Sequence, residues 1–144
     1  MKSLVAMMLI VLSVSVLMIS GCASTKPKGE NWKGLGSNVD GSWFYDATSI
    51  TRPSKDVVGV WVKLVWTDNG RTDNVKKYGD SFRTLDHTLA LLEIHCVDKK
   101  LRTLSQYSYS TNGDRLRSVD NENAAWGFIP PGSVMDALNK IVCR

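Results

Sequence analysis

Two histidines, His87 and His95, are the only imidazoles that this sequence offers as general bases near neutral pH. His95 directly precedes Cys96, and the two would form a nucleophilic pair if their side chains met. Neighbouring side chains on a β-strand point to opposite faces of the sheet, which disfavours that pairing. We therefore expect these histidines to be solvated or hydrogen-bonded strand residues and not catalytic groups.

Acidic residues offer no clear metal site. Asp68, Asp73 and Asp80 lie in one polar stretch, but their spacing does not match a calcium-binding EF-hand loop. The sequence also lacks the glycine-rich patterns GxxxxGK[ST] and GxGxxG that hold phosphates and dinucleotides. We therefore predict a non-enzymatic protein with no metal or cofactor.

The first of the three cysteines, Cys22, follows a typical export signal. Lys2 precedes an uncharged, mostly apolar run at residues 4–19, which is shorter than the approximately 20 residues that span a bilayer. The run ends in Ile-Ser-Gly-Cys, which resembles a bacterial lipobox. Residues 1–21 are therefore predicted to be a lipoprotein signal peptide, and Cys22 is predicted to carry the palmitate-bearing lipid anchor.

The residues after Cys22 are small and polar and include proline and glycine, as in a flexible tether. We predict a lipidated tether over 22–40 and a folded domain over 41–144. Ala23 stands where an Asp would oppose passage to the outer membrane, so an outer-membrane location is expected. The sequence leaves open whether the domain is surface-exposed or faces the periplasm.

Cys96 and Cys143 remain as an even pair in an oxidising compartment, which predicts a disulfide. A disulfide between these cysteines would close the loop over residues 96–143 and stabilise the fold by about 4 kcal/mol in the chain-entropy model. The alternatives are a metal pair or a catalytic thiol. Neither is favoured, because the sequence has no CxxC motif.

The mature domain is predicted to be α+β, with an antiparallel β-sheet of five to six strands and one C-terminal helix packed on a face of the sheet. Runs rich in β-branched and aromatic residues predict strands at 43–48, 57–67, 87–97, 100–110 and 115–120. Ser133 with Asp136 predicts a helix start, and an apolar stripe follows at Val134, Leu138 and Ile141. The disulfide would join this helix to the sheet.

Two local features of the sheet follow from the pattern. A two-residue turn at Asp98 and Lys99 would place Cys96 opposite Leu101, with Tyr107 on the apolar face and Gln106 on the polar face. The polar stretch 68–86 has no clear periodicity and is expected to be a mobile excursion, with at most a short hairpin.

The chain has 18 basic and 14 acidic residues, and a net charge of +4 is too small to indicate nucleic-acid binding. Of the five tryptophans, Trp43, Trp61 and Trp126 are expected in the core, and Trp66 is the candidate for an exposed interface anchor. Basic groups could dock an acidic partner or simply be solvated charges. The candidate partner-binding residues are Trp66, Lys76, Lys77, Lys99, Lys100, Arg102, Arg115 and Arg117.

The order of several segments resembles the surface-adhesin protein E family. They are residues 45–50 (YDATSI), 60–63 (VWVK), 93–96 (EIHC), Asn112-Gly113, 126–133 (WGFIPPGS) and the final Val142-Cys143. The resemblance implies an antiparallel sheet tied to a C-terminal helix by a disulfide, on an outer-membrane lipoprotein. It also implies adhesion to host matrix proteins such as vitronectin or laminin. A periplasm-facing binding or inhibitory module remains the alternative, and a homodimer is compatible with either.

The predicted disulfide can be tested on exported protein. Mass spectrometry after alkylation without reduction should find neither Cys96 nor Cys143 modified, because both sulfurs are bonded. Alkylation of both residues would contradict the pairing.

Overall fold

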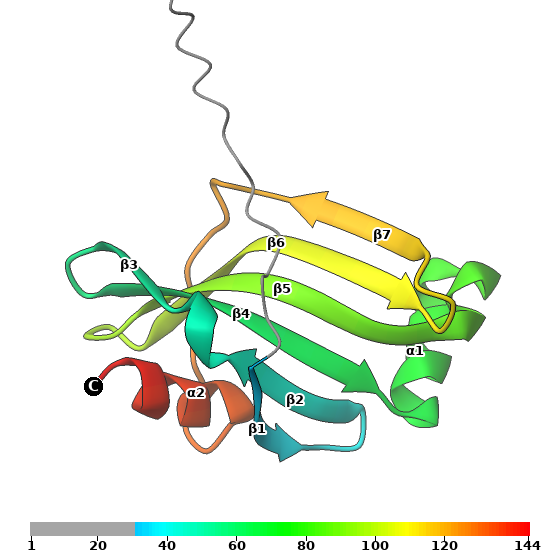
Figure 1. The fold of residues 1–144 in the computed structure, drawn as a ribbon, viewed down its shortest axis with the longest axis horizontal. Coiled ribbons are helices and arrows are strands. Elements are labelled where there is room, and N and C mark those ends of the chain that lie inside the picture. The colour runs from blue at the N-terminus through cyan, green and yellow to red at the C-terminus, as the bar shows by residue number, and fades with distance from the viewer. Residues whose placement is uncertain (1–30) are drawn as a thin grey trace, which may run out of the picture.

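The computed structural model describes residues 31–144 as one antiparallel sheet with two α-helices (Figure 1). The predicted signal peptide and Cys22 lie outside these residues. The strand order is β1-β2-β4-β5-β6-β7, with β3 paired to β4 and β8 paired to β6. The strands are β1 (Trp32–Ser37), β2 (Gly41–Asp46), β3 (Thr51–Ser54), β4 (Val57–Trp66), β5 (Leu85–His95), β6 (Lys100–Ser110), β7 (Arg115–Asp120) and β8 (Gly127–Phe128). Among the described residues, no helix is long and apolar enough to cross a bilayer.

The core lies between the central strands and helix α2 (Val134–Val142). Alternate residues of β4 point to this side, and Val58, Val60 and Val62 are almost completely buried. Leu138 and Val142 of α2 complete the same apolar cluster. The predicted helix is confirmed. We call the face of the sheet on which α2 packs the helix face.

The predicted disulfide between Cys96 and Cys143 is also present. It joins the end of α2 to the turn after β5, across a sequence separation of 47 residues. Arg52 of β3 supports this end of the helix, because its guanidinium donates to the carbonyl oxygens of Val142 and Arg144 at 3.4 and 3.2 Å.

The sheet has more strands than predicted. Strand β1 occupies residues that the sequence pattern assigns to the tether. Its Gly34 and Gly36 lie on either side of a shift in the pairing of β1 with β2. Leu35 packs against the core, and this contact explains why a strand forms there in spite of the glycines. The described domain therefore begins before residue 41, and the eight strands exceed the expected five to six.

The predicted register of the β5–β6 hairpin is wrong. The turn spans four residues, 96–99, with Lys99 at a φ of 50°, so Ile94 and not Cys96 lies opposite Leu101. A bulge then shifts the pairing between Leu91 and Leu92.

This bulge exchanges the faces of the later β6 residues. Tyr107 pairs with Leu89 and stacks on Trp61 at 6.0 Å, on the side away from α2, whereas Gln106 pairs with Ala90 on the helix face. Both assignments are the reverse of the prediction. One extra residue in a strand with period two moves every subsequent side chain to the other face.

The expected excursion is in fact ordered, with helix α1 (Asp68–Tyr78) followed by the 3₁₀ helix η2 (Asp80–Thr84). Thr67 caps α1 by accepting a hydrogen bond from the Gly70 amide, and Gly79 ends it at a φ of 94°. The helix is polar on nearly every side, so it lacks the apolar stripe that reveals most helices in a sequence. The prediction of an irregular segment is therefore wrong.

The tryptophans divide differently from the prediction. Trp43 packs against the core cluster and Trp61 is buried on the opposite face, as expected for structural residues. Trp126 is 36% exposed and lies on the loop before β8, so its assignment to the core is wrong.

The carboxylate of Asp136, at the start of α2, forms hydrogen bonds that we expect to stabilise this helix. Its carboxylate accepts hydrogen bonds from Lys140 Nζ at 2.8 Å and from the Gly132 amide at 3.0 Å, and these contacts hold its pKa below the usual value. A lowered folded-state pKa stabilises the fold above about pH 4, and this stabilisation is lost as the pH falls through the folded value.

We expect Asp136→Asn to lower the melting temperature at pH 7, with a difference from wild type that narrows near pH 3. Thermal unfolding at several pH values measures this. Asp114→Asn, which changes an exposed turn carboxylate, is the matched control and should leave the pH profile unchanged. An equal loss at both pH values would show that the charge of Asp136 does not matter.

Candidate protein-binding surfaces

The candidate binding residues lie in two groups at opposite ends of the sheet (Figure 1). Lys99, Lys100 and Arg102 are at the β5–β6 turn, beside the disulfide. The other candidates lie at the α1 end, where β4 stops and β7 begins: Trp66, Lys76, Lys77, Arg115 and Arg117. Strand β6 is 11 residues long and separates the groups, because its two hairpin turns are at opposite ends.

The first surface is a groove of about 420 Å³ between α1 and the helix face of the sheet. We call it the α1 groove. Trp66 forms part of its wall, and its indole nitrogen donates to Thr88 Oγ1 at 2.9 Å. Trp66 is therefore a half-buried wall residue, fixed in orientation. The lining residues are Asp40, Trp66, Gly70, Asp73, Asn74, Lys77, Tyr78 and Gln106.

Gly70 allows α1 to approach this closely. A Cβ atom at this position would lie 2.3 Å from the Asp40 carbonyl oxygen and 2.7 Å from the Trp66 ring. The first of these neighbours is backbone, which cannot move aside without shifting the chain. The depth of the groove therefore depends on a glycine inside a helix.

Two cations face one aromatic ring at the rim of the groove. Lys77 Nζ lies 4.9 Å and the Arg117 guanidinium 4.5 Å from the Tyr78 ring centre. The hydrogen bond from Lys77 and the positive charges of both residues lower the pKa of Tyr78. Lys76, by contrast, pairs with Asp73 at 2.8 Å, and Arg115 lies 5.9 Å from the Tyr107 ring on the opposite face. Lys77 in the lining and Arg117 at the rim thus supply positive charge, and the lining also contains the carboxylates of Asp40 and Asp73.

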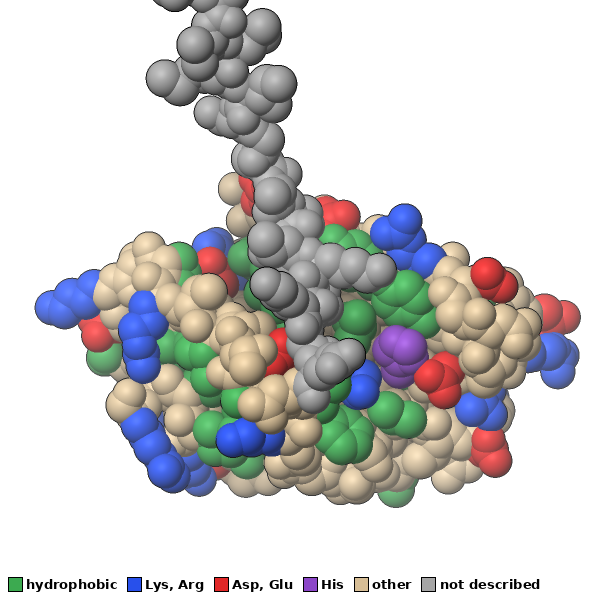
Figure 2. All heavy atoms as spheres, in the orientation of Figure 1, with side chains coloured by type: hydrophobic (Ala, Val, Ile, Leu, Met, Phe, Trp, Pro, Cys, Tyr) green, Lys and Arg blue, Asp and Glu red, His purple; other side chains and the backbone are tan. Residues whose placement is uncertain are grey.

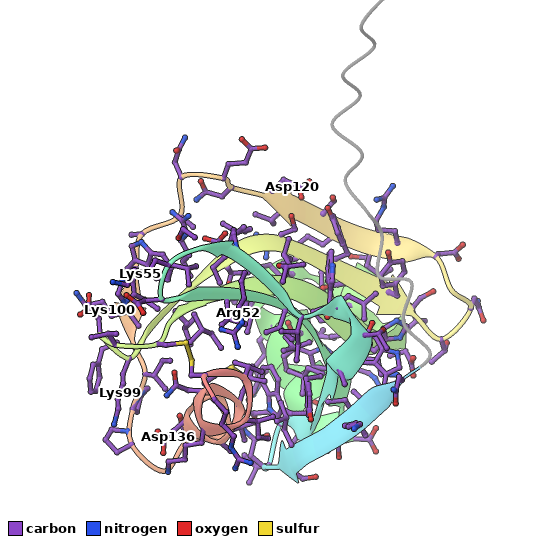
Figure 3. The ribbon with its side chains drawn as sticks, turned by 60° about the vertical axis from the view of Figure 1, so that its left-hand side comes forward. Arg52, Lys55, Lys99, Lys100, Asp120 and Asp136 are labelled. Atoms are coloured by element: carbon purple, nitrogen blue, oxygen red, sulfur yellow. A yellow bond between two sulfur atoms is a disulfide. The ribbon has the colours of Figure 1, made fainter. Side chains whose placement is uncertain are left out.

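The second surface is the end of the sheet beside the disulfide. We call it the disulfide tip, and it consists of Lys55, Val97, Lys99, Lys100, Trp126 and Phe128. Hydrogen bonds bring its three segments together: the Cys96 amide donates to Asp56 O at 2.8 Å, and the Ile129 amide donates to Lys99 O at 3.0 Å. Figure 3 shows Lys55, Lys99 and Lys100 on the same side of the molecule.

Arg102 lies just behind this tip and is not free for a partner. Its guanidinium pairs with Glu93 at 2.6 Å and lies 4.6 Å from the Trp126 ring centre. It therefore positions Trp126. Sequence reasoning missed Lys55, Val97 and Phe128, although the turn residues around Lys55 and Val97 were a partial signal.

The histidines occupy the structural roles that the sequence predicts. His87 contacts Asp86 at 2.7 Å and stacks on Tyr109, while His95 Nδ1 accepts a hydrogen bond from the Asp98 amide at 3.3 Å. Cys96 is bonded to Cys143 and is not available as a nucleophile. Within residues 31–144, no group of three or more potential metal ligands comes together.

The comparison with family models identifies this architecture. The model for surface-adhesin protein E matches residues 32–144. The chain belongs to the surface-adhesin protein E family. A search among curated protein sequences returned no match.

Solved structures of protein E from Haemophilus influenzae share the fold. Crystal form II is 12% identical with a TM-score of 0.53, and the match covers 80% of this chain and 88% of that one. The selenomethionine form is 11% identical with a TM-score of 0.54, over 80% and 87% of the two chains. At such low identity the likeness supports the fold alone.

The close approach at Gly70 generates a stability prediction. We expect Gly70→Ala to destabilise the protein by about 1–3 kcal/mol in urea unfolding, because the added methyl overpacks the α1 contact. Gly34→Ala is the matched control, since a Cβ there meets nothing within 4 Å. Helix propensity alone would make the Gly70→Ala variant more stable than the wild-type protein. That result would contradict the packing argument.

Proposed function

We propose that this protein is a non-enzymatic outer-membrane lipoprotein that binds another protein, and that it acts as an adhesin for host extracellular-matrix proteins. The observation that carries the proposal is its membership of the surface-adhesin protein E family. The predicted signal peptide over 1–21 and the lipid-bearing Cys22 supply the membrane attachment. A vitronectin- or laminin-like matrix protein is the expected partner.

The α1 groove is the part of the domain best suited to such a partner. It is concave and combines the walls of Trp66 and Tyr78 with the charges of Lys77 and Arg117. Aromatic and cationic side chains in a concave site commonly carry most of the binding energy at protein interfaces. The groove therefore favours a partner segment with an apolar side chain next to a carboxylate.

The alternative function is a periplasm-facing module that binds or inhibits another envelope protein. It would use the same lipid anchor and the same groove, and it differs only in the side of the outer membrane on which the domain is displayed. A second copy of the chain is a further candidate partner.

Display on the cell surface separates the two functions. If the protein is an adhesin, protease added to intact cells should remove the domain, and Cys22→Ser should abolish both lipid labelling and surface retention. A periplasmic marker protein that survives the same treatment controls for cell integrity. A domain that resists protease until the outer membrane is opened would rule out adhesion and favour the periplasmic function.

Charge reversal tests the groove. The Lys77→Glu and Arg117→Glu double variant should weaken capture of vitronectin or laminin by about tenfold or more, measured by surface plasmon resonance. The Lys99→Glu and Lys100→Glu variant changes the same charge at the opposite end and should retain capture. Loss in the second variant alone would place the protein-binding surface at the disulfide tip.

A further inference from the structure

The cations of this domain are distributed unequally between its two ends. Around α1, Arg71, Lys76 and Arg83 each pair with an aspartate three residues away. At the disulfide tip, Lys55, Lys99 and Lys100 are exposed and form no ion pair with any carboxylate in residues 31–144. Lys77, Arg115 and Arg117 at the α1 end also lack a carboxylate partner, but each lies over the ring of Tyr78 or Tyr107. Among residues 31–144, the lysines of the tip (Figure 3) have neither an ion-pair partner nor an aromatic ring beneath them.

The carboxylates near the tip are largely committed to other groups. Glu93 pairs with Arg102, Asp136 pairs with Lys140, and Asp98 faces His95 at 3.7 Å. Asp136 also lies close enough to Lys99 for their charges to interact. Asp56 is exposed in the turn next to Lys55 and reduces the local charge by one. With histidine neutral, Asp98 also keeps its negative charge, so Lys55, Lys99 and Lys100 against Asp56 and Asp98 leave the tip with a net charge of +1.

The segments that carry these lysines, and the neighbouring strand β8, also carry exposed apolar side chains. Val97 is 70% exposed, Phe128 is 66% exposed and Trp126 is 36% exposed. These side chains lie at the tips of turns and on the two-residue strand β8, which pairs Phe128 with Lys100. Arg102 and His95 contact the Trp126 ring, whereas Val97 and Phe128 are largely exposed and would gain free energy from leaving water.

We propose that the disulfide tip docks on an anionic membrane surface. Lysines that are free of internal partners would contact lipid phosphates, and Val97, Phe128 and Trp126 would enter the interfacial layer. This combination of exposed aromatic or apolar residues with lysines is what binds proteins to the surface of anionic bilayers. A rigid scaffold presents it here, because the disulfide and the hydrogen bonds of Cys96 and Ile129 fix the three segments relative to one another.

Membrane docking would assign different tasks to the two ends of the sheet. The tip would face the bilayer, and the α1 groove at the other end would point away from it toward a protein partner. The inference is independent of the proposed function, since the vesicle contact needs neither a matrix protein nor the lipid anchor.

Vesicle flotation tests the proposal with the mature chain, residues 22–144, carrying Cys22→Ser so that no acyl chain contributes. The protein should float with vesicles of phosphatidylcholine and phosphatidylglycerol in equal parts, and not with phosphatidylcholine alone. Binding should weaken as salt rises and screens the charges. Equal binding to both kinds of vesicle, or to neither, would overturn the proposal.

Matched variants locate the contact. Lys99→Glu with Lys100→Glu should reduce the affinity for anionic vesicles by about tenfold or more, given the contribution of each lysine near a charged surface. Val97→Ser with Phe128→Ser should reduce it as well, without changing the charge. Lys77→Glu with Arg117→Glu is the control and should bind normally, so a loss common to all variants would overturn the assignment to the tip.

Competition distinguishes a membrane surface from other anionic ligands. Inorganic phosphate at equal ionic strength should not displace the protein from vesicles, and neither should polyglutamate. Displacement by phosphate would indicate a simple phosphate site, and displacement by polyglutamate an acidic protein as the ligand. Either result would overturn membrane docking while leaving the capture assay of the α1 groove unaffected.

Discussion

Burial of one apolar stripe of α2 against the centre of the sheet is the contact on which the rest of the structure depends. Leu138 and Val142 belong to the same buried cluster as Val58, Val60 and Ile94, and the disulfide links the helix covalently to the sheet. A domain of this size buries only about two-thirds of the surface that its unfolded chain exposes, so a cross-link and a well-packed helix contribute a large part of its stability. The helix also fixes which face of the sheet is apolar.

Helix α2 packs on the helix face, and α1 lies at the end of the sheet where β4 stops (Figure 1). The space between α1 and the sheet is the α1 groove. Arg71 and Lys76 of α1 pair with aspartates three residues away, and Lys77 lies over the Tyr78 ring. The lysines of the disulfide tip form no ion pair among residues 31–144. Figure 2 shows the basic residues scattered along the surface, with several at the end of the molecule that bears this tip.

The sequence pattern was most reliable where a signal is local. The strands β4 to β7, the capped helix α2 and the disulfide follow from β-branched runs, a Ser–Asp cap and the parity of the cysteines. The pattern failed at Tyr107 and Gln106, because a bulge earlier in β6 leaves no mark in local composition. It also failed at α1, because a polar helix held by caps and ion pairs lacks apolar periodicity.

The sequence by itself determined the kind of domain: a disulfide-linked antiparallel sheet with a C-terminal helix. Only the tertiary structure decided which candidate residues act together. It separated Lys99 and Lys100 from Lys77 and Arg117, and it joined Phe128 to a turn far away in the chain. The reason is physical: hydrogen-bond register and helix packing set distances between remote segments, and neither is encoded in the spacing of residues along the chain.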